Sequence, residues 1–262
     1  MIKILAALTF FTLLGGCASS YVTPGRSVNL MSIQDLEIKD IYKTKPTAKF
    51  PAYIAFTRIQ ESGYSSYSSD SYGRGRFSVV TNRDIESDHD LEKIQKLPGV
   101  AGITPLAKII IPRNISGLKD LRLAAAKLHA DILMVYTFET SFKVGPKRFQ
   151  ASDIFTLGFL DNKEVIVFST ASAAFYDAKT GYLYGLAEAT ERKSQMSDLW
   201  ESSSVVDKLR KEAEKSAFAS LIPQIEKTWD GIIKRYQLKA LNNLPQRKNH
   251  LLRLSATQAI FR

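Results

Sequence analysis

Apolar runs of strand length recur through the middle of this 262-residue chain. Ala52–Ile59 is rich in aromatic and β-branched residues, and Ile132–Phe138 is apolar at almost every position. An unbroken apolar run of this length predicts a strand that is covered on both faces, at least where it begins. Shorter runs at Phe77–Val80 and Lys108–Pro112 predict two further short strands.

The segment Asp177–Gly181 separates two longer runs of the same kind. Glu164–Tyr176 precedes it and Tyr182–Ala189 follows it. Aspartate and glycine at these positions are typical of a tight turn, in which the final glycine supplies a positive φ. We therefore predict a β-hairpin over these residues.

Three segments carry helical signals instead. A helix is predicted over Asp88–Gln95, and a second from an N-cap at Ser116 to about His129. From about Ser203 an apolar residue recurs every three or four positions, which predicts a long amphipathic helix. Pro223 lies inside this pattern and should kink or split the helix. The stripe comprises Val206, Leu209, Ala213, Ala217, Leu221, Ile225, Trp229, Ile232 and Tyr236.

The N-terminus has the order of a signal sequence. Lys3 precedes an apolar stretch, Ile4–Leu13, which ends in Leu14-Gly15-Gly16-Cys17. An ordinary secretory signal and a membrane-spanning anchor are the alternatives, but a span needs roughly 20 apolar residues. Small residues leading into a cysteine resemble the lipobox of bacterial lipoproteins, and Cys17 is the only cysteine. The resemblance implies removal of residues 1–16 and acylation of Cys17.

The resemblance also implies a location in the cell. Acyl chains on one residue give stable membrane anchoring. A residue other than aspartate after the cysteine, here Ala18, implies sorting to the outer membrane in lipoproteins of this type. We therefore expect a lipid-anchored protein of the bacterial outer membrane that faces the periplasm.

Composition describes the part beyond the signal. A hydrophobic content of 45% and a mean hydropathy of -0.12 are typical of a globular body with a core. With a single cysteine, the chain has no internal disulfide framework. The net charge of +10 at first suggests nucleic acid, but an envelope address excludes it. Anionic lipid, peptidoglycan or an acidic protein partner fits the charge better.

Two flanking segments differ from the central part, residues 51–237. Residues 17–50 carry turn chemistry and are expected to form a tether that holds the domain away from the membrane. Residues 238–262 form a basic tail without an acidic residue. The tail is either a solvated segment or an amphipathic one that touches anionic lipid or a partner.

The segment Glu61–Arg76 is biased towards serine, tyrosine and glycine. A flexible loop is one interpretation. The other is a contact loop, because tyrosine provides contact area at low entropic cost. On the second interpretation the partner-binding residues are Tyr64, Tyr67, Tyr72, Arg74 and Arg76.

Motifs for catalysis or cofactor binding are missing from the sequence. It has three histidines, His89, His129 and His250, and no nucleophile elbow, Walker loop or zinc-protease motif. The acidic stretch Arg83–Asp90 includes His89 but has no second histidine at ligand spacing, so the acids are assigned to a helix start. The glycines of Gly73-Arg74-Gly75-Arg76 lack the third glycine of a dinucleotide loop. We expect no metal and no cofactor.

One longer pattern resembles known envelope proteins. An alanine-rich helix runs through Ala130-Asp131 into an apolar strand, within Leu121–Tyr136, and an Asp-x-x-Thr-Gly turn follows at Asp177–Gly181. These features resemble the curli secretion lipoprotein, the lipoprotein activators of penicillin-binding proteins and the N-terminal domain of TolB. The resemblance covers roughly residues 50–237 and implies an α+β fold, a mixed sheet with helices packed on it, in one domain. It implies no enzyme activity.

Three classes of function remain. The first is a non-catalytic module that docks an envelope protein partner, which the lipid anchor and the missing motifs favour. The second is an oligomeric secretion or channel component. The third is an enzyme acting on cell-wall material through carboxylates, which only geometry can identify.

Overall fold

The computed structural model describes residues 26–29, 38–66, 69, 71–144, 163–197 and 203–242. The predictions for residues 1–16, Cys17, Tyr67 and the part of the tail beyond residue 242 lie outside these residues. In chain order the elements are α2 (Ile38–Ile41), β1 (Ala52–Glu61), β2 (Arg74–Gly75), β3 (Phe77–Val80), α3 (Asp88–Gln95), β4 (Val100–Pro105), the 3-10 helix η3 (Lys108–Ile110), β5 (Asn114–Ile115), α4 (Leu118–Lys127), β6 (Ile132–Val144), β7 (Lys163–Asp177), β8 (Leu183–Ser197) and α6 (Ser203–Asn242).

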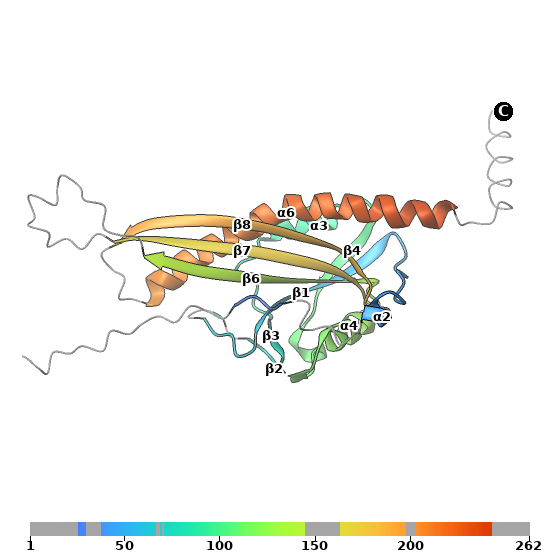
Figure 1. The fold of residues 1–262 in the computed structure, drawn as a ribbon, viewed down its shortest axis with the longest axis horizontal. Coiled ribbons are helices and arrows are strands. Elements are labelled where there is room, and N and C mark those ends of the chain that lie inside the picture. Colours follow the sequence, from blue (N-terminus) through green and yellow to red (C-terminus); the bar gives the residue numbers. More distant parts are fainter. Residues whose placement is uncertain are drawn as a thin grey trace, which may run out of the picture.

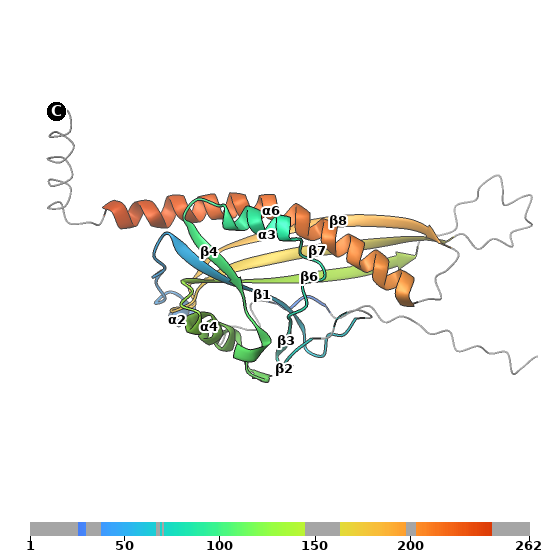
Figure 2. The same cartoon turned by 180° about the vertical axis from the view of Figure 1, so that it is seen from behind.

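The fold is α+β, a single domain built on a mixed open sheet. The strand order is β3-β1-β6-β7-β8, and β4 also pairs with β1. Strand β1 is parallel to β6 and β4, whereas β6, β7 and β8 form an antiparallel ribbon. The helices α6 and α3 lie on one face of the sheet and α4 lies on the other (Figure 1; Figure 2). The predicted fold class is therefore confirmed.

The apolar strands β1 and β6 are buried on both faces, as their sequences predict. In β6, Met134, Tyr136 and Phe138 belong to the core beneath α6. Leu133 and Val135 belong to the core beneath α4. The strand β6 and its neighbours continue beyond this doubly covered part, and there the α4 side of the ribbon is uncovered, with Glu139 and Ser141 exposed.

The predicted hairpin is confirmed and is longer than the sequence indicated. Gly181 ends the turn with a φ of +77°, and strands β7 and β8 pair from Tyr176 and Leu183 to Lys163 and Ser197. Strand β7 matches the predicted run, whereas β8 continues past Ala189 through polar residues, so the apolar pattern of β8 stops well before its pairing does.

The long C-terminal helix is continuous through Pro223. Its predicted stripe is buried from Val206 to Ile232, where it packs on β7 and β8. The axis bends part-way along its length (Figure 1; Figure 2), and the helix is not split at Pro223. The proline side chain is exposed, which keeps its ring out of the helix-sheet interface.

Two local predictions are wrong. Lys108–Ile110 forms a 3-10 helix instead of a strand, and Ile109 is 91% exposed. The isoleucines there are bracketed by Pro105 and Pro112, which cannot donate to a sheet ladder.

Helix α4 begins at Leu118 with Gly117 as its N-cap, and Ser116 instead donates to the Asp120 carboxylate. The strand β4, Val100–Pro105, was not predicted because it is half-exposed and interrupted by glycine.

A buried ion network joins α6 to the sheet. Arg58 of β1 and Arg210 and Glu214 of α6 are each at most 1% exposed. Glu214 Oε2 accepts from Arg58 Nη2 at 3.2 Å and also from Arg210 Nη1. Its other oxygen accepts from the Thr140 hydroxyl of β6 at 3.0 Å. One carboxylate therefore links the helix to two strands.

The charged and hydroxyl groups around the network shift the pKa values of Asp84 and Arg58. Asp84 lies 3.6 Å from Arg58 Nη1 and 3.3 Å from Lys211 Nζ. Burial raises the pKa of Asp84, but the Ser69 hydroxyl and these cations outweigh burial, so the pKa is lowered. Burial of Arg58 would lower its pKa, but the Glu214 charge more than offsets this, so the pKa is raised. The ion pairs of the network are therefore formed at neutral pH.

Removing the shared carboxylate should destabilise the protein strongly. Glu214→Ala leaves two buried guanidinium groups without their common partner, and breaking a buried pair in this way costs about 3–5 kcal/mol. The matched control is Asp230→Ala on the same helix, which breaks an exposed pair with Lys234 and should cost about 0.5 kcal/mol or less. Urea unfolding measures both, and equal losses would contradict the assigned role of Glu214.

A second network surrounds Asp177 at the β7–β8 turn. Its carboxylate accepts from the backbone N–H groups of Lys179 and Thr180 in the turn and of Thr47 and Ala48 in the N-terminal segment. The Tyr184 hydroxyl donates to it at 2.8 Å. Burial raises the pKa of Asp177, but these hydrogen bonds outweigh burial, so its pKa is lowered. Part of the predicted tether is thus held on the turn.

The substitution Asp177→Asn should lower the free energy of unfolding at pH 7 by about 3 kcal/mol, because charge-assisted hydrogen bonds contribute about 1.5–3 kcal/mol each. The pKa of Asp177 is depressed by folding, so its stabilising contribution is present above the unfolded value, about 3.9, and is lost as the pH falls through the folded value. The deficit of the variant should therefore shrink when urea unfolding is repeated below pH 4. A deficit independent of pH would contradict this account.

Candidate functional site

The five residues expected to bind a partner do not all lie together in the structure. Tyr64 is 3% exposed, and its hydroxyl accepts from Arg58 Nη2 at 3.2 Å within the buried ion network. The prediction that Tyr64 is an exposed contact residue is therefore wrong. A tyrosine hydroxyl can accept a hydrogen bond from a buried guanidinium. The serine- and glycine-rich sequence around Tyr64 gave no sign of this burial. Tyr67 lies outside the described residues.

The other three residues lie at one corner of the molecule. Tyr72 is half-buried and bridges to Val79 of β3, and Arg74 and Arg76 are exposed at the two-stranded pair of β2 and β5. Arg74 N donates to Arg113 O at 2.7 Å, which brings a third arginine to the same place. Lys108 lies over the Tyr72 ring, 4.8 Å from its centroid.

We call this surface the basic corner; it comprises Arg74, Arg76, Lys108, Ile109 and Arg113. The glycines between its arginines have a structural role. Gly75 has a φ of +130°, and a Cβ there would overlap the Ile115 carbonyl of β5. Only glycine lets the two strands approach this closely. The alternation of glycine and arginine therefore forms a narrow strand pair that displays cations, and it forms no phosphate loop.

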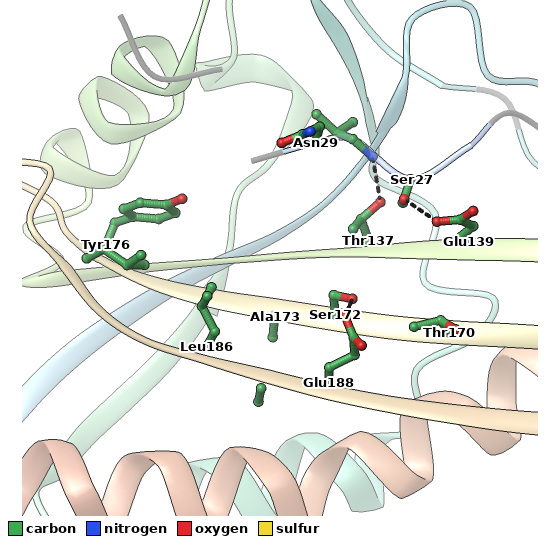
Figure 3. A pocket seen from close by; sticks show the side chains of 13 residues that line it. Ser27, Asn29, Thr137, Glu139, Thr170, Ser172, Ala173, Tyr176, Leu186 and Glu188 are labelled. Carbon is green, nitrogen blue, oxygen red and sulfur yellow. Dashed lines mark hydrogen bonds between the residues drawn. The ribbon is translucent and has the colours of Figure 1, made fainter. Parts of the chain in front are cut away.

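A groove lies on the uncovered face of the ribbon (Figure 3). It holds about 320 Å³ between the segment Ser27–Asn29 and strands β6, β7 and β8. Leu186, which is 57% exposed, contributes apolar surface, and Glu139 and Glu188 contribute charge. Sequence reasoning missed the groove, although the alternation of Thr137, Glu139 and Ser141 gave a signal for an uncovered face.

Both carboxylates of the groove are exposed and accept hydrogen bonds from serine hydroxyls. Glu139 accepts from the Ser27 hydroxyl at 2.9 Å and Glu188 from the Ser172 hydroxyl at 2.9 Å, and both side chains are exposed. A general acid near neutral pH needs a carboxyl whose pKa is raised by burial. Glu86 has a pKa raised by burial, but it is enclosed in the core, where the Tyr136 hydroxyl donates to it at 2.7 Å.

The histidines are explained by the fold where it is described. His129 has a φ of +56° directly after α4, and the N–H groups of His129 and Ala130 donate to carbonyls of the last turn. It therefore lies in the C-terminal cap of α4. His89 is exposed in the first turn of α3. Within the described part of the chain, no three histidine, cysteine, aspartate or glutamate side chains are grouped to hold a metal.

No helix among the described residues is both long and apolar enough to cross a membrane. This holds even for the 40-residue helix α6, whose exposed face carries many charges.

Comparison with known proteins gives fold likenesses to bacterial proteins. No family model matches the chain, and no curated protein matches it. A minor lipoprotein from Acinetobacter baumannii is 10% identical over 69% of this chain and 94% of its own, with a TM-score of 0.30. Lipoprotein GNA1162 from Neisseria meningitidis is 12% identical over 64% and 99%, with a TM-score of 0.29. A Xanthomonas campestris protein of the DUF330 family is 11% identical over 72% and 94%, with a TM-score of 0.31. Because these TM-scores are low, the function has to be argued from this chain's own residues.

Proposed function

We propose that this protein is a non-catalytic, lipid-anchored protein of the bacterial outer membrane that faces the periplasm and docks a protein partner through the basic corner. The observation that carries the proposal is Ile109. This large apolar side chain is 91% exposed and follows Lys108, whose ammonium lies over the Tyr72 ring, and the Arg74 and Arg113 backbones are hydrogen-bonded nearby in the chain. An apolar anchor within a charged rim is the usual composition of a docking surface.

The chemistry of the corner defines the partner. The corner has four cations: Arg74 in β2, Arg76 directly after it, Lys108 in the 3-10 helix and Arg113 directly before β5. Complementary charge speeds association and selects among partners. The partner is therefore a protein surface with an apolar pocket for Ile109 and carboxylates around the pocket.

The anchor is the second part of the proposal. Acylation of Cys17 after removal of residues 1–16 rests on Leu14-Gly15-Gly16-Cys17 and on the absence of any other cysteine in the sequence. The resemblance to the curli secretion and penicillin-binding-protein activator lipoproteins supports the same address. Labelled palmitate incorporated into the wild type and lost in Cys17→Ser tests it.

The oligomeric alternative has one specific feature in its favour. Strand β8 ends the sheet order and, among the described strands, pairs only with β7. An unpaired edge can accept a strand of another molecule. We favour the docking module because the β8 edge carries Glu188, Glu191, Arg192 and Lys193, and charges of this kind protect edges from pairing.

A photo-crosslinking residue at position 109 of the intact lipoprotein should capture one envelope protein in cells. Reversing charge with Arg74→Glu and Arg113→Glu should lower that capture about tenfold, equivalent to ~1.4 kcal/mol. The control variant, Lys119→Glu with Lys127→Glu on α4, makes the same change in net charge at two exposed positions and should leave capture within about twofold. Mass spectrometry identifies the captured protein.

Two results would count against the docking proposal. Equal capture by both charge-reversed variants would show that the basic corner does not bind the partner. Ladders made only of this chain would favour the oligomeric alternative.

A further inference from the structure

The chain entering the domain is fixed to the sheet from Arg26 onward. Val28 is buried, and its N–H donates to the Thr137 hydroxyl at 3.3 Å. The Ser27 hydroxyl donates to Glu139. Arg26 exchanges backbone contacts with Glu61, since Glu61 N donates to Arg26 O and Arg26 N donates to the Glu61 carboxylate. Residues in the expected tether are thus part of the domain surface.

These contacts give the chain a direction. Val28 contacts Thr137 and Ser27 contacts Glu139, so a step towards the N-terminus moves two residues along β6 towards its end at Val144. Arg26 contacts Glu61, the last residue of β1, and β1 runs parallel to β6, so the described chain begins on the side of the domain that faces the outer end of the β6–β7–β8 ribbon, away from the β7–β8 turn.

Chain length then limits the distance to an anchor on Cys17. Nine residue steps separate Cys17 from Arg26. A fully extended chain spans at most about 3.3–3.6 Å per residue, so Arg26 lies within about 30 Å of Cys17. An anchor on Cys17 would therefore hold the domain within this distance at Arg26, which lies on the ribbon-end side of the domain.

The ribbon end has the chemistry of a membrane contact. Phe168 of β7 is half-buried on the uncovered face, with Lys143 Nζ 5.1 Å and the Arg192 guanidinium 5.8 Å from its ring centroid. The sheet register sets this group one pleat beyond Glu139, since Ser141 pairs with Phe168 and Phe168 pairs with Arg192. Ile166 lies half-buried in the next row. We call Lys143, Ile166, Phe168 and Arg192 the ribbon-end patch.

We propose that the ribbon-end patch rests on the anionic lipid surface in which Cys17 is anchored. This inference depends on the lipid anchor proposed above. Lysine and arginine near an anionic leaflet each strengthen its binding about fivefold, and aromatic rings favour the headgroup region. Glu139 and Glu188 lie four residues back along β6 and β8, belong to the groove and accept from Ser27 and Ser172, and Glu164 of β7 lies two residues beyond Ile166.

Site-specific fluorescence in the intact lipoprotein tests this orientation. An environment-sensitive dye is placed at Ser194→Cys, exposed beside Ile166, or at Lys127→Cys on α4, near the opposite end of β6. The protein is reconstituted into phosphatidylcholine vesicles with and without phosphatidylglycerol, and nitroxide headgroups serve as quencher. Quenching at position 194 should exceed that at 127 at least threefold when phosphatidylglycerol is present.

Charge-reversed variants test whether the ribbon-end patch itself makes the membrane contact. Lys143→Glu with Arg192→Glu should reduce quenching at position 194 about threefold or more, whereas Lys119→Glu with Lys127→Glu, studied with the dye at 194, should leave it unchanged. Equal quenching at the two dye positions, or no response to the patch variant, overturns the orientation if palmitate is incorporated. A wild type that incorporates no palmitate overturns the anchor and the orientation with it.

Discussion

The carboxylate of Glu214, shared by two buried guanidinium groups, is the interaction on which the arrangement of the molecule depends. It connects α6 to β1 and β6 where the helix core is narrow, with Leu209 and Ala213 against Val165 and Val167. Small apolar side chains alone would let the helix slide along the ribbon. A fixed pattern of charged hydrogen bonds permits one register, so the network contributes specificity as well as stability, as buried polar groups do in some other folds.

Two stretches of the N-terminal segment are held on the sheet by polar contacts. Asp177 holds residues 47 and 48 at the hairpin turn, and Thr137 and Glu139 hold residues 27 and 28 on the uncovered face. The basic corner and the ribbon-end patch share no residue, and the patch adjoins the groove one pleat beyond Glu139. A partner and a membrane could both contact the domain without competing for the same residues.

Local pattern was sufficient for the elements whose environment is set by their own sequence. The apolar run of β6, the turn ending at Gly181 and the stripe of α6 each specify their burial directly. The predictions for Tyr64 and Lys108–Ile110 were wrong for the opposite reason. The first is buried because Arg58, six residues away on another element, needs its hydroxyl, and the second is kept out of the sheet by prolines on either side. The groove depends on which face α4 leaves uncovered, and that is a tertiary property.

The fixed entry of the chain at Arg26 also affects how tightly the domain has to bind. With the proposed anchor on Cys17, a short linker would keep the docking surface in a thin layer above the bilayer, and a partner held in the same layer would meet it at an effective concentration in the millimolar range. At such concentrations a small contact, such as one isoleucine with a few cations, is occupied most of the time although its intrinsic affinity is weak. Dissociation then stays fast, and the complex can be remade whenever the envelope is rearranged.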